Sequence, residues 1–230
     1  MPNIQIQGST VIMDNEFKFD IDNNIFNVFS SDTFENIKKK YNLNNCSNLN
    51  QIHSNIIKIV DENYQNNSLG DAMITKEKNI ALVIKTADCI PVLLYDKEKK
   101  VIATIHSGWK GTLNNIVGNT VKDMIDKFNS NKENIAAYIY PSIKQCHFEV
   151  ENDVYEQFKN KINNINKYTI KKANKYHIAM QTIIINYLYE LGISNIYDSN
   201  ICTYCNHTIY HSYRYNHTDK RNYLVVMIKE

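Results

Sequence analysis

The segment from Thr86 to Gly111 constrains the fold more than any other part of this chain. Two short apolar runs rich in β-branched residues, Ile90 to Tyr95 and Val101 to Ile105, flank a polar stretch from Asp96 to Lys99. This pattern is typical of two strands joined by a turn. The segment therefore predicts a β-hairpin.

The predicted hairpin brings a cysteine and a histidine together. A symmetric turn pairs Leu94 with Val101, and the same register places Cys89 directly opposite His106. Directly opposed residues share a face, with Cβ atoms roughly 4.5–5.5 Å apart. A thiolate and an imidazole at that separation can bind a zinc ion or act as nucleophile and base, and both alternatives stay open. The turn has no glycine or asparagine, so a bulge is an alternative, and a one-residue slip would separate the two side chains.

A third candidate donor lies upstream, in Gln51-Ile52-His53-Ser54, followed by the apolar run from Ile56 to Val60. Two imidazoles and one thiolate leave a fourth tetrahedral position for water, which is the open arrangement of catalytic zinc. Such a site predicts about one zinc per chain. The alternative is that His53 is an ordinary loop histidine.

Four motifs carry a resemblance to a known family: Gln51-Ile52-His53, Thr86-Ala87-Asp88-Cys89-Ile90-Pro91, His106-Ser107-Gly108-Trp109-Lys110-Gly111 and Ser212-Tyr213-Arg214. From about Gln51 to its C-terminus the chain resembles the bacterial polyphenol oxidase or laccase-domain family, whose members are purine nucleoside-processing metalloenzymes. The resemblance implies that His53, Cys89 and His106 are metal ligands. It also implies phosphorolysis of adenosine, inosine and methylthioadenosine, and hydrolytic deamination of adenosine, with purine nucleosides and phosphate as partners.

The first fifty residues diverge from that family. Its members usually carry an arginine and a Gly-Gly-Val-Ser loop before the Gln-x-His motif, where this chain has Asn27 to Asp32. Asp32 stands in place of the arginine, and an anionic side chain there would repel phosphate. Tyr140 and Ala179 also replace a usual glycine and aspartate. A metal-binding protein with weak catalysis therefore stays open beside the enzyme.

Arginine is rare in this chain and falls near its end. Two of the 26 basic residues are arginines, Arg214 and Arg221. A planar guanidinium can hold two oxygens of an anion at once, which lysine cannot do. Arg214 is therefore a candidate catalytic residue and a candidate clamp for phosphate or substrate, and Ser212 of the same motif is a candidate for binding the same anion or substrate. A structural ion pair is the alternative for both arginines.

Two further residues of the motifs have open roles. Trp109 is a candidate surface for stacking a purine, although a single tryptophan is more often part of the core. Asp88 is a candidate catalytic residue that orients a ligand or accepts a proton. An aspartate before a strand is also a common turn residue.

Other chemistries are weighed against the zinc enzyme. A metal-free cysteine hydrolase would use Cys89 and His106 as nucleophile and base. Copper in place of zinc stays open, but a multicopper centre is rejected, because the seven histidines include no His-x-His pair. One residue between the pairs Cys202, Cys205 and His207, His211 is too short for these four to converge on zinc. Cys146 and His147 point to opposite sides if their segment is extended.

Composition excludes several classes. With 230 residues and 43% apolar content, the chain can bury a full core, and we expect one domain over residues 1–230. A net charge of +2 argues against a nucleic-acid partner. No run approaches the ~18 apolar residues that span a bilayer, and the start lacks a secretory pattern. Five cysteines, an odd number, favour the reducing cytoplasm.

Local patterns complete the expected fold. Helices are expected over 113–128, capped by Thr112, over 154–162, and over 177–191, ended by Gly192; strands are expected over 135–139 and 223–228. Strands thus cluster in hairpins and helices lie outside them. The expected class is α+β, a single domain with mixed sheets, antiparallel hairpins and flanking helices.

Overall fold

The computed structural model describes residues 15–230, and the expectation about a secretory start rests mainly on residues 1–14, which lie outside that range. The first sheet contains, in order, β1 (Glu16–Phe17), β2 (Ile25–Ser30), β15 (Asn222–Ile228), β7 (Ala81–Thr86), β3 (Cys46–Asn50) and β5 (Ser68–Leu69). The second contains, in order, β14 (Asn195–Asp198), β10 (Ile135–Ile139), β8 (Ile90–Asp96), β9 (Val101–Ser107), β6 (Ala72–Thr75) and β4 (Ile57–Ile59). Both sheets mix parallel and antiparallel pairs.

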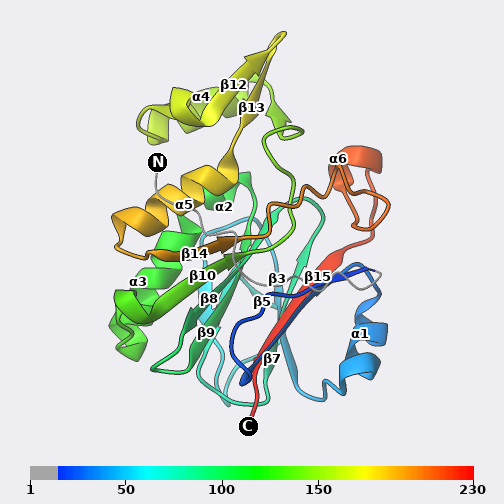
Figure 1. Ribbon diagram of the computed structural model, residues 1–230, viewed down its shortest axis with the longest axis vertical. Coiled ribbons are helices and arrows are strands. Elements are labelled where there is room, and N and C mark those ends of the chain that lie inside the picture. The colour runs from blue at the N-terminus through cyan, green and yellow to red at the C-terminus, as the bar shows by residue number, and fades with distance from the viewer. Residues whose placement is uncertain (1–14) are drawn as a thin grey trace.

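A third, smaller sheet orders its strands as β11 (Glu149–Val150), β13 (Lys175–Ile178) and β12 (Thr169–Lys172). The helices are α1 (Phe34–Tyr41), α2 (Trp109–Leu113), α3 (Ile116–Phe128), α4 (Asn152–Lys161), α5 (Met180–Glu190) and α6 (Tyr213–Asn216), with single turns at Lys132–Asn134 and Ile165–Tyr168. The β12–β13 hairpin and α4 project from the top of the molecule in Figure 1.

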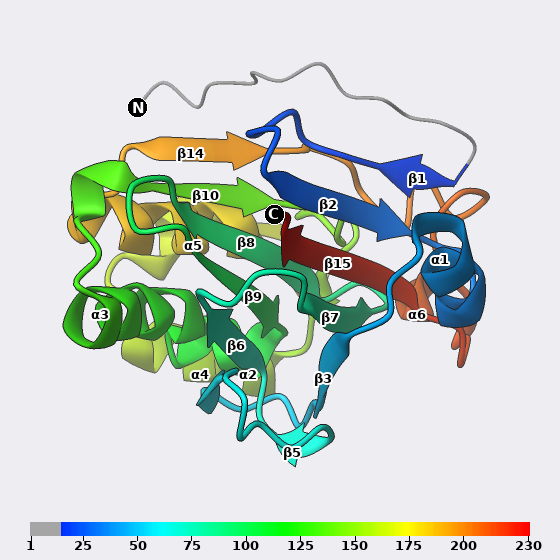
Figure 2. The same ribbon diagram turned by 90° about the horizontal axis from the view of Figure 1, so that it is seen from below.

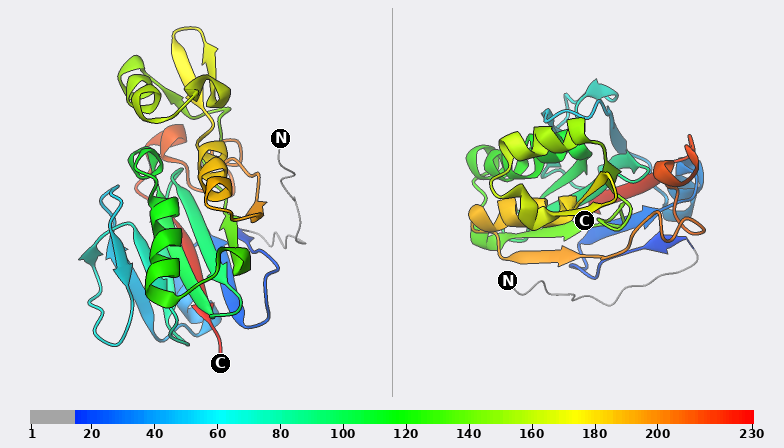
Figure 3. Two further views of the ribbon diagram at one scale, coloured as in Figure 1. Left: turned by 90° about the vertical axis from the view of Figure 1, so that its left-hand side faces the viewer. Right: turned by 90° about the horizontal axis from the view of Figure 1, so that it is seen from above.

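The two large sheets pack face to face, and helices cover their outer faces (Figure 2). Alternate residues of each strand point to opposite faces. In β15, Leu224 and Val226 therefore enter the core between the sheets, while Val225 packs with Ile37 of α1 on the outside. In β8, Leu93 belongs to the core between the sheets, whereas Val92 and Leu94 belong to a second core that includes residues of α3 and α5. These two helices lie against the second sheet (Figure 3). The predicted α+β class is confirmed.

The predicted hairpin is present, but its predicted register is wrong by two residues. Leu94 pairs with Ala103 rather than Val101, and Pro91 rather than Cys89 lies opposite His106. A two-residue turn would require positive φ at its centre, which lysine and glutamate supply poorly. The connection instead uses four residues after Asp96, whose carboxylate accepts backbone N–H bonds of 2.9 and 3.1 Å, and Lys100 takes φ 53°. A shift of two keeps every side chain on its face.

Two helix predictions are wrong at their N-terminal ends. The helix expected from Leu113 is divided, because Asn115 takes φ 52° and its side chain caps α3 through the Gly118 N–H. Thr112 is therefore a buried residue of α2 rather than a cap. Strand β13 occupies the beginning of the expected 177–191 helix, so α5 starts at Met180.

The remaining local predictions are confirmed. Strands β10 and β15 cover the expected ranges, and α4 begins two residues before the expected helix. Gly192 follows α5 with φ 83°, as expected of a residue that ends a helix. Within residues 15–230, no helix is both long enough and apolar enough to cross a membrane.

Candidate metal centre and cavity

The candidate site lies at one end of the sandwich, where β7 and β9 end and β8 begins. His106 is the penultimate residue of β9, and Cys89 immediately precedes β8. By strand parity both point toward the first sheet, as Leu93 does. His53 comes from the loop after β3 and reaches the same place. The ligand atoms of the three residues all lie within 4.8 Å of one another.

The geometry within this trio suits one ion. Cys89 Sγ lies 3.8 Å from His53 Nε2, and the two imidazole rings are 4.9 Å apart between centroids. Two nitrogens and one sulfur from the protein leave a coordination position open, as in catalytic zinc sites. The hairpin interpretation is thus correct in bringing Cys89 and His106 together, although they are not directly opposed.

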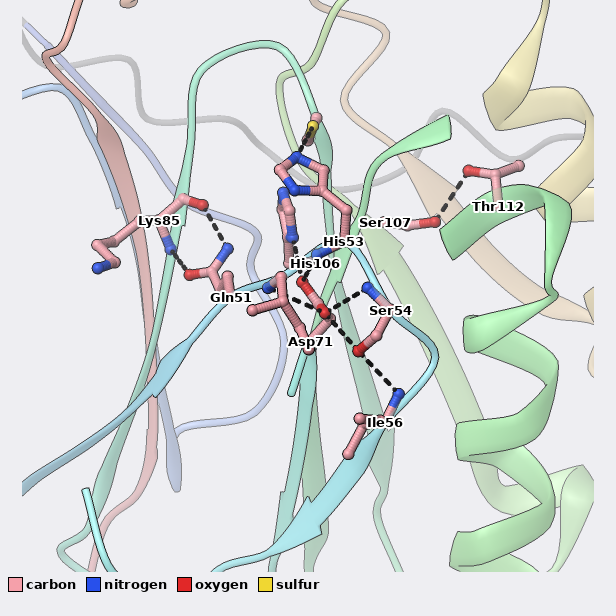
Figure 4. A network of polar contacts seen from close by, with 11 residues as sticks. Gln51, His53, Ser54, Ile56, Asp71, Lys85, His106, Ser107 and Thr112 are labelled. Carbon is pink, nitrogen blue, oxygen red and sulfur yellow. Dashed lines mark hydrogen bonds and ion pairs between the residues drawn. The ribbon is translucent and has the colours of Figure 1, made fainter. Parts of the chain in front are cut away.

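A buried aspartate, Asp71, organises two of the three donors (Figure 4). Its carboxylate accepts a 2.8 Å hydrogen bond from His106 Nδ1, which turns Nε2 of that ring toward the trio. It also accepts from the backbone N–H groups of Ile52, His53 and Ser54, and from the Ser54 hydroxyl at 2.7 Å. These bonds hold His53 at φ 58°, a backbone conformation that is rare outside glycine. Asp71 therefore positions both histidines.

The loop that carries His53 has a second anchor at Gln51. Its side-chain amide donates to the Lys85 carbonyl and accepts from the Lys85 N–H, both at 2.8 Å. The side chain thereby continues the pairing of β3 with β7 beyond the end of β3. Gln51 thus ties the loop to β7, and His53, two residues later, reaches the trio.

The charged groups of the site shift one another's pKa values away from their usual ranges. Burial alone would raise the pKa of the Cys89 thiol, but His106 and then His53 lower it below its usual value. Burial alone would lower the pKa of His106, but Cys89 and Asp71 raise it. Burial would likewise raise the pKa of Asp71, yet hydrogen bonds from His106 and Ser54 lower it to about 2. The site is therefore preorganised for charged groups.

Gly108 leaves the space that the trio needs. A Cβ atom added there would lie 2.8 Å from His53 Cδ2 and 3.1 Å from Cys89 Sγ, while φ is an ordinary −73°. We expect Gly108→Ala to displace His53 and weaken metal binding roughly ten- to a hundredfold, with little loss of stability. Metal titration of the variant measures this. Gly111→Ala, whose Cβ would meet no atom closer than 3.3 Å, is the control, and equal affinities would contradict the close fit.

The trio lines a cavity of about 380 Å³. Its wall is formed by Asn50, Gln51, His53, Lys85, Thr86, Ala87, Cys89, His106, Tyr213 and Arg221. The cationic side chains of this wall are Lys85 and Arg221, and its large aromatic side chain is Tyr213. Arg221, rather than Arg214, is thus the arginine at the cavity that contains the trio.

Arg214 and Asp88 face a neighbouring hollow of about 150 Å³, which also borders Cys89 and Trp109. Arg214 Nη1 donates to the carbonyls of His147 and Glu149, at 3.2 and 2.9 Å. The Asp88 carboxylate accepts from Thr203 Oγ1 at 2.6 Å and from the Arg214 N–H at 2.7 Å. The Asp88 side chain therefore connects the start of β8 to the C-terminal segment, and the Arg214 side chain connects that segment to residues 147–149. The catalytic roles of both residues stay predictions.

The other predicted residues lie around these hollows. Ser212 caps α6 through the Tyr215 N–H and is buried. Trp109 is half-buried, with its ring 6.4 Å from that of Phe158. Asp32 accepts hydrogen bonds from Thr33 N–H and Asn36 Nδ2 at the start of α1, and it does not line the 380 Å³ cavity. The position of the Asp32 side chain therefore does not support the expectation that it repels phosphate from this cavity.

The spacing predicts that no zinc site forms from the four residues Cys202, Cys205, His207 and His211. Their side chains indeed do not meet at one point. His207 stacks on Tyr215, and His211 Nε2 lies 3.0 Å from the Ser31 carbonyl. Cys146 and His147 would point to opposite sides only in an extended segment, but the Phe148 N–H bonds back to the Lys144 carbonyl and the segment turns. Their side chains therefore lie together, with His147 Nδ1 3.2 Å from Cys146 Sγ.

Sequence reasoning missed Asp71 and assigned Arg221 no role in the site. Asp71 precedes β6 as a single acidic residue after a glycine, a pattern that also fits an ordinary turn. Its partner His106 lies 35 positions away. The scarcity of arginine could have pointed to Arg221 as a site residue, because it applies equally to Arg214 and Arg221.

Comparisons with known proteins agree on one family. Residues 31–229 match a family model described as "multi-copper polyphenol oxidoreductase laccase". A purine nucleoside phosphorylase of Campylobacter jejuni is 36% identical over 225 residues, covering 92% of this chain and 90% of its own. An adenosine deaminase from an unknown prokaryotic organism is 30% identical over 177 residues, covering 71% and 67%. The crystal structure of the hypothetical protein YfiH of Bacillus licheniformis superposes with a TM-score of 0.87 at 22% identity, covering 95% and 98%.

Proposed function

Because this chain belongs to the multi-copper polyphenol oxidoreductase laccase family, we propose that it is a metal-dependent enzyme that acts on purine nucleosides. The relatives named purine nucleoside phosphorylase and adenosine deaminase support this substrate class. The observation that carries the proposal is the trio of His53, Cys89 and His106 on the wall of a cavity large enough for a small ligand.

The donor set fits a single zinc ion. Imidazole nitrogen and thiolate sulfur are zinc ligands, and Asp71 gives His106 the outer-shell carboxylate partner that zinc-binding histidines usually have. Copper accepts the same donors. When bound, the ion supplies Lewis acidity to the cavity.

Other residues of the chain position the donors, attract phosphate and stack on the purine. Asp71 fixes the ring of His106 and the loop of His53, so the donors need not reorganise. Lys85 and Arg221 form a positive wall that attracts phosphate. Tyr213 offers a ring for the purine inside the cavity, and Trp109 offers one in the adjoining hollow.

Two reactions are consistent with this arrangement. In phosphorolysis a phosphate oxygen bonds to the ribose C1′ while the bond from C1′ to the base nitrogen breaks, and the base leaves after protonation. In hydrolytic deamination water adds to C6 of adenine and the bond from C6 to the amino nitrogen breaks, which releases ammonia. We propose both activities, on adenosine, inosine or methylthioadenosine for the first and on adenosine for the second.

Product analysis tests the proposal. The purified chain is incubated with adenosine, with and without phosphate, and products are separated by chromatography. Adenine and ribose 1-phosphate that appear only with phosphate identify phosphorolysis, and inosine identifies deamination. The absence of all three products, from protein that contains its metal, would refute the proposal.

A metal-free cysteine hydrolase is the second candidate, favoured by the stabilised thiolate of Cys89 beside His106. Metal removal separates the two. A chelator abolishes the activity of the metal-dependent enzyme, and resupplied zinc restores it, whereas a cysteine hydrolase stays active throughout.

Phosphate recognition predicts a specific defect at Arg221. Arg221→Lys keeps the charge but loses the planar fork, so we expect the phosphate concentration at half-maximal rate to rise roughly ten- to a hundredfold, with metal content unchanged. Phosphate titration at saturating nucleoside measures this. Arg214→Lys is the second arm, because the Ser-Tyr-Arg motif predicts Arg214 as the clamp. A larger effect at Arg214 would assign the clamp there.

A further inference from the structure

A second group of metal donors lies outside the cavity, where two distant segments meet. Its members are Cys146, His147, Cys202 and Cys205, whose ligand atoms all lie within 4.8 Å of one another. All three cysteines are free thiols. We propose that these four residues bind a structural zinc ion in a closed Cys3His site. This ion is separate from the one proposed for the trio and takes no part in the chemistry proposed there.

The distances match those between ligands of one tetrahedral ion. Cys146 Sγ lies 3.6 Å from Cys202 Sγ and 3.8 Å from Cys205 Sγ. His147 Nδ1 lies 3.2 Å from Cys146 Sγ and 3.3 Å from Cys205 Sγ. Zinc bonds of about 2.3 Å to sulfur and 2.0–2.1 Å to nitrogen place tetrahedral ligands about 3.8 Å apart for two sulfurs and about 3.5 Å for sulfur and nitrogen.

The backbone presents these donors through turns and an isolated bridge. Ser142 pairs with Cys202, with 3.2 Å bonds from Ser142 N–H to the Ile201 carbonyl and from Thr203 N–H to the Ser142 carbonyl. A turn closed by the Asn206 N–H on the Cys202 carbonyl folds Cys205 back toward Cys202. The pairing brings together segments about sixty positions apart.

Surrounding groups support a bound thiolate and an oriented histidine. The Lys144 N–H points at Cys202 Sγ at 3.5 Å, the kind of outer-shell hydrogen bond that tunes metal-bound sulfur. The ring of His147 stacks on Tyr204, with centroids 3.9 Å apart. Four protein donors complete a tetrahedron, so this ion has no open position and its role is structural.

The position of the site indicates what it stabilises. The His147 carbonyl accepts a hydrogen bond from Arg214 Nη1. Thr203, which lies between Cys202 and Cys205, donates its hydroxyl to the Asp88 carboxylate. Asp88 directly precedes Cys89 of the trio. The second ion therefore holds the C-terminal segment against Asp88, next to Cys89 of the candidate active site and just before β8.

Zinc content of the purified full-length chain, prepared with reductant, tests the inference. We expect about two zinc ions per chain in the wild type and about one in Cys205→Ser or in Cys89→Ser, because each substitution removes a ligand from a different site. The double variant is expected to hold almost none. Cys46→Ser and His207→Ala, which change residues in neither donor group, are expected to keep both ions.

Cobalt substitution gives an independent measurement if Cys205→Ser fails to fold. In Cys89→Ser, cobalt bound at the remaining site should show thiolate charge-transfer absorption about three times that of a one-thiolate site, as expected for Cys3His. A single zinc in the wild type, lost in Cys89→Ser and kept in Cys205→Ser, overturns the inference. A disulfide among Cys146, Cys202 and Cys205 in protein purified with reductant overturns it as well. Neither result depends on nucleoside activity.

Discussion

Cys89→Ser and His106→Ala are each expected to remove the ion from the trio and to lower nucleoside kcat/KM by at least about a thousandfold, or about 4 kcal/mol. Serine is a poorer zinc ligand than a thiolate, and alanine removes the nitrogen that Asp71 orients. Metal analysis together with steady-state kinetics measures both effects on the same preparations.

The combination of results separates the two proposed mechanisms. Loss of activity together with loss of one ion supports the metal enzyme. Loss of activity in Cys89→Ser with metal content unchanged would instead make Cys89 a nucleophile. Cys46→Ser is the matched control, because Cys46 is a half-buried thiol outside both donor groups, and it should change neither quantity.

Asp71→Asn is expected to destabilise the protein by about 3–5 kcal/mol, which lowers Tm by about 6–20 °C in a chain of this size. Each carboxylate oxygen of Asp71 accepts from donors alone: His106 and His53 on one side, Ser54 and Ile52 on the other. An amide places an N–H against donors in either orientation, so buried hydrogen bonds are lost. Metal affinity at the trio should also fall, roughly ten- to a hundredfold.

Thermal unfolding and metal titration of Asp71→Asn check both parts. Asp61→Asn is the control, since Asp61 is exposed and its carboxylate accepts from Asn63 N–H at a surface turn. A melting temperature within about 2 °C of wild type, less than the shift from 1 kcal/mol, would show that Asp71 does not hold the loop of His53 in solution. Normal metal affinity would show that it does not orient His106.

Local patterns were sufficient for much of the fold and for part of the site. The alternation in β8 and β9 predicts that Cys89 and His106 share a face, and this survives a register error of two residues because side-chain direction repeats every two. The turn that decides the register depends on Asp96 and Lys100, whose conformations follow from hydrogen bonding and strand twist rather than from hydrophobic pattern. Asn115 divides the predicted helix for a similarly local reason.

The sequence by itself determined the α+β class, the hairpin that brings Cys89 and His106 together, and a group of three candidate metal donors, because these depend on periodicity and on motifs of adjacent residues. Only the tertiary structure decided which residues complete each site. Asp71 meets His106, Arg221 lines the cavity, and Cys146 and His147 join Cys202 and Cys205. Each of these contacts depends on backbone pairing between segments that are far apart in the chain, and no local pattern records such pairing.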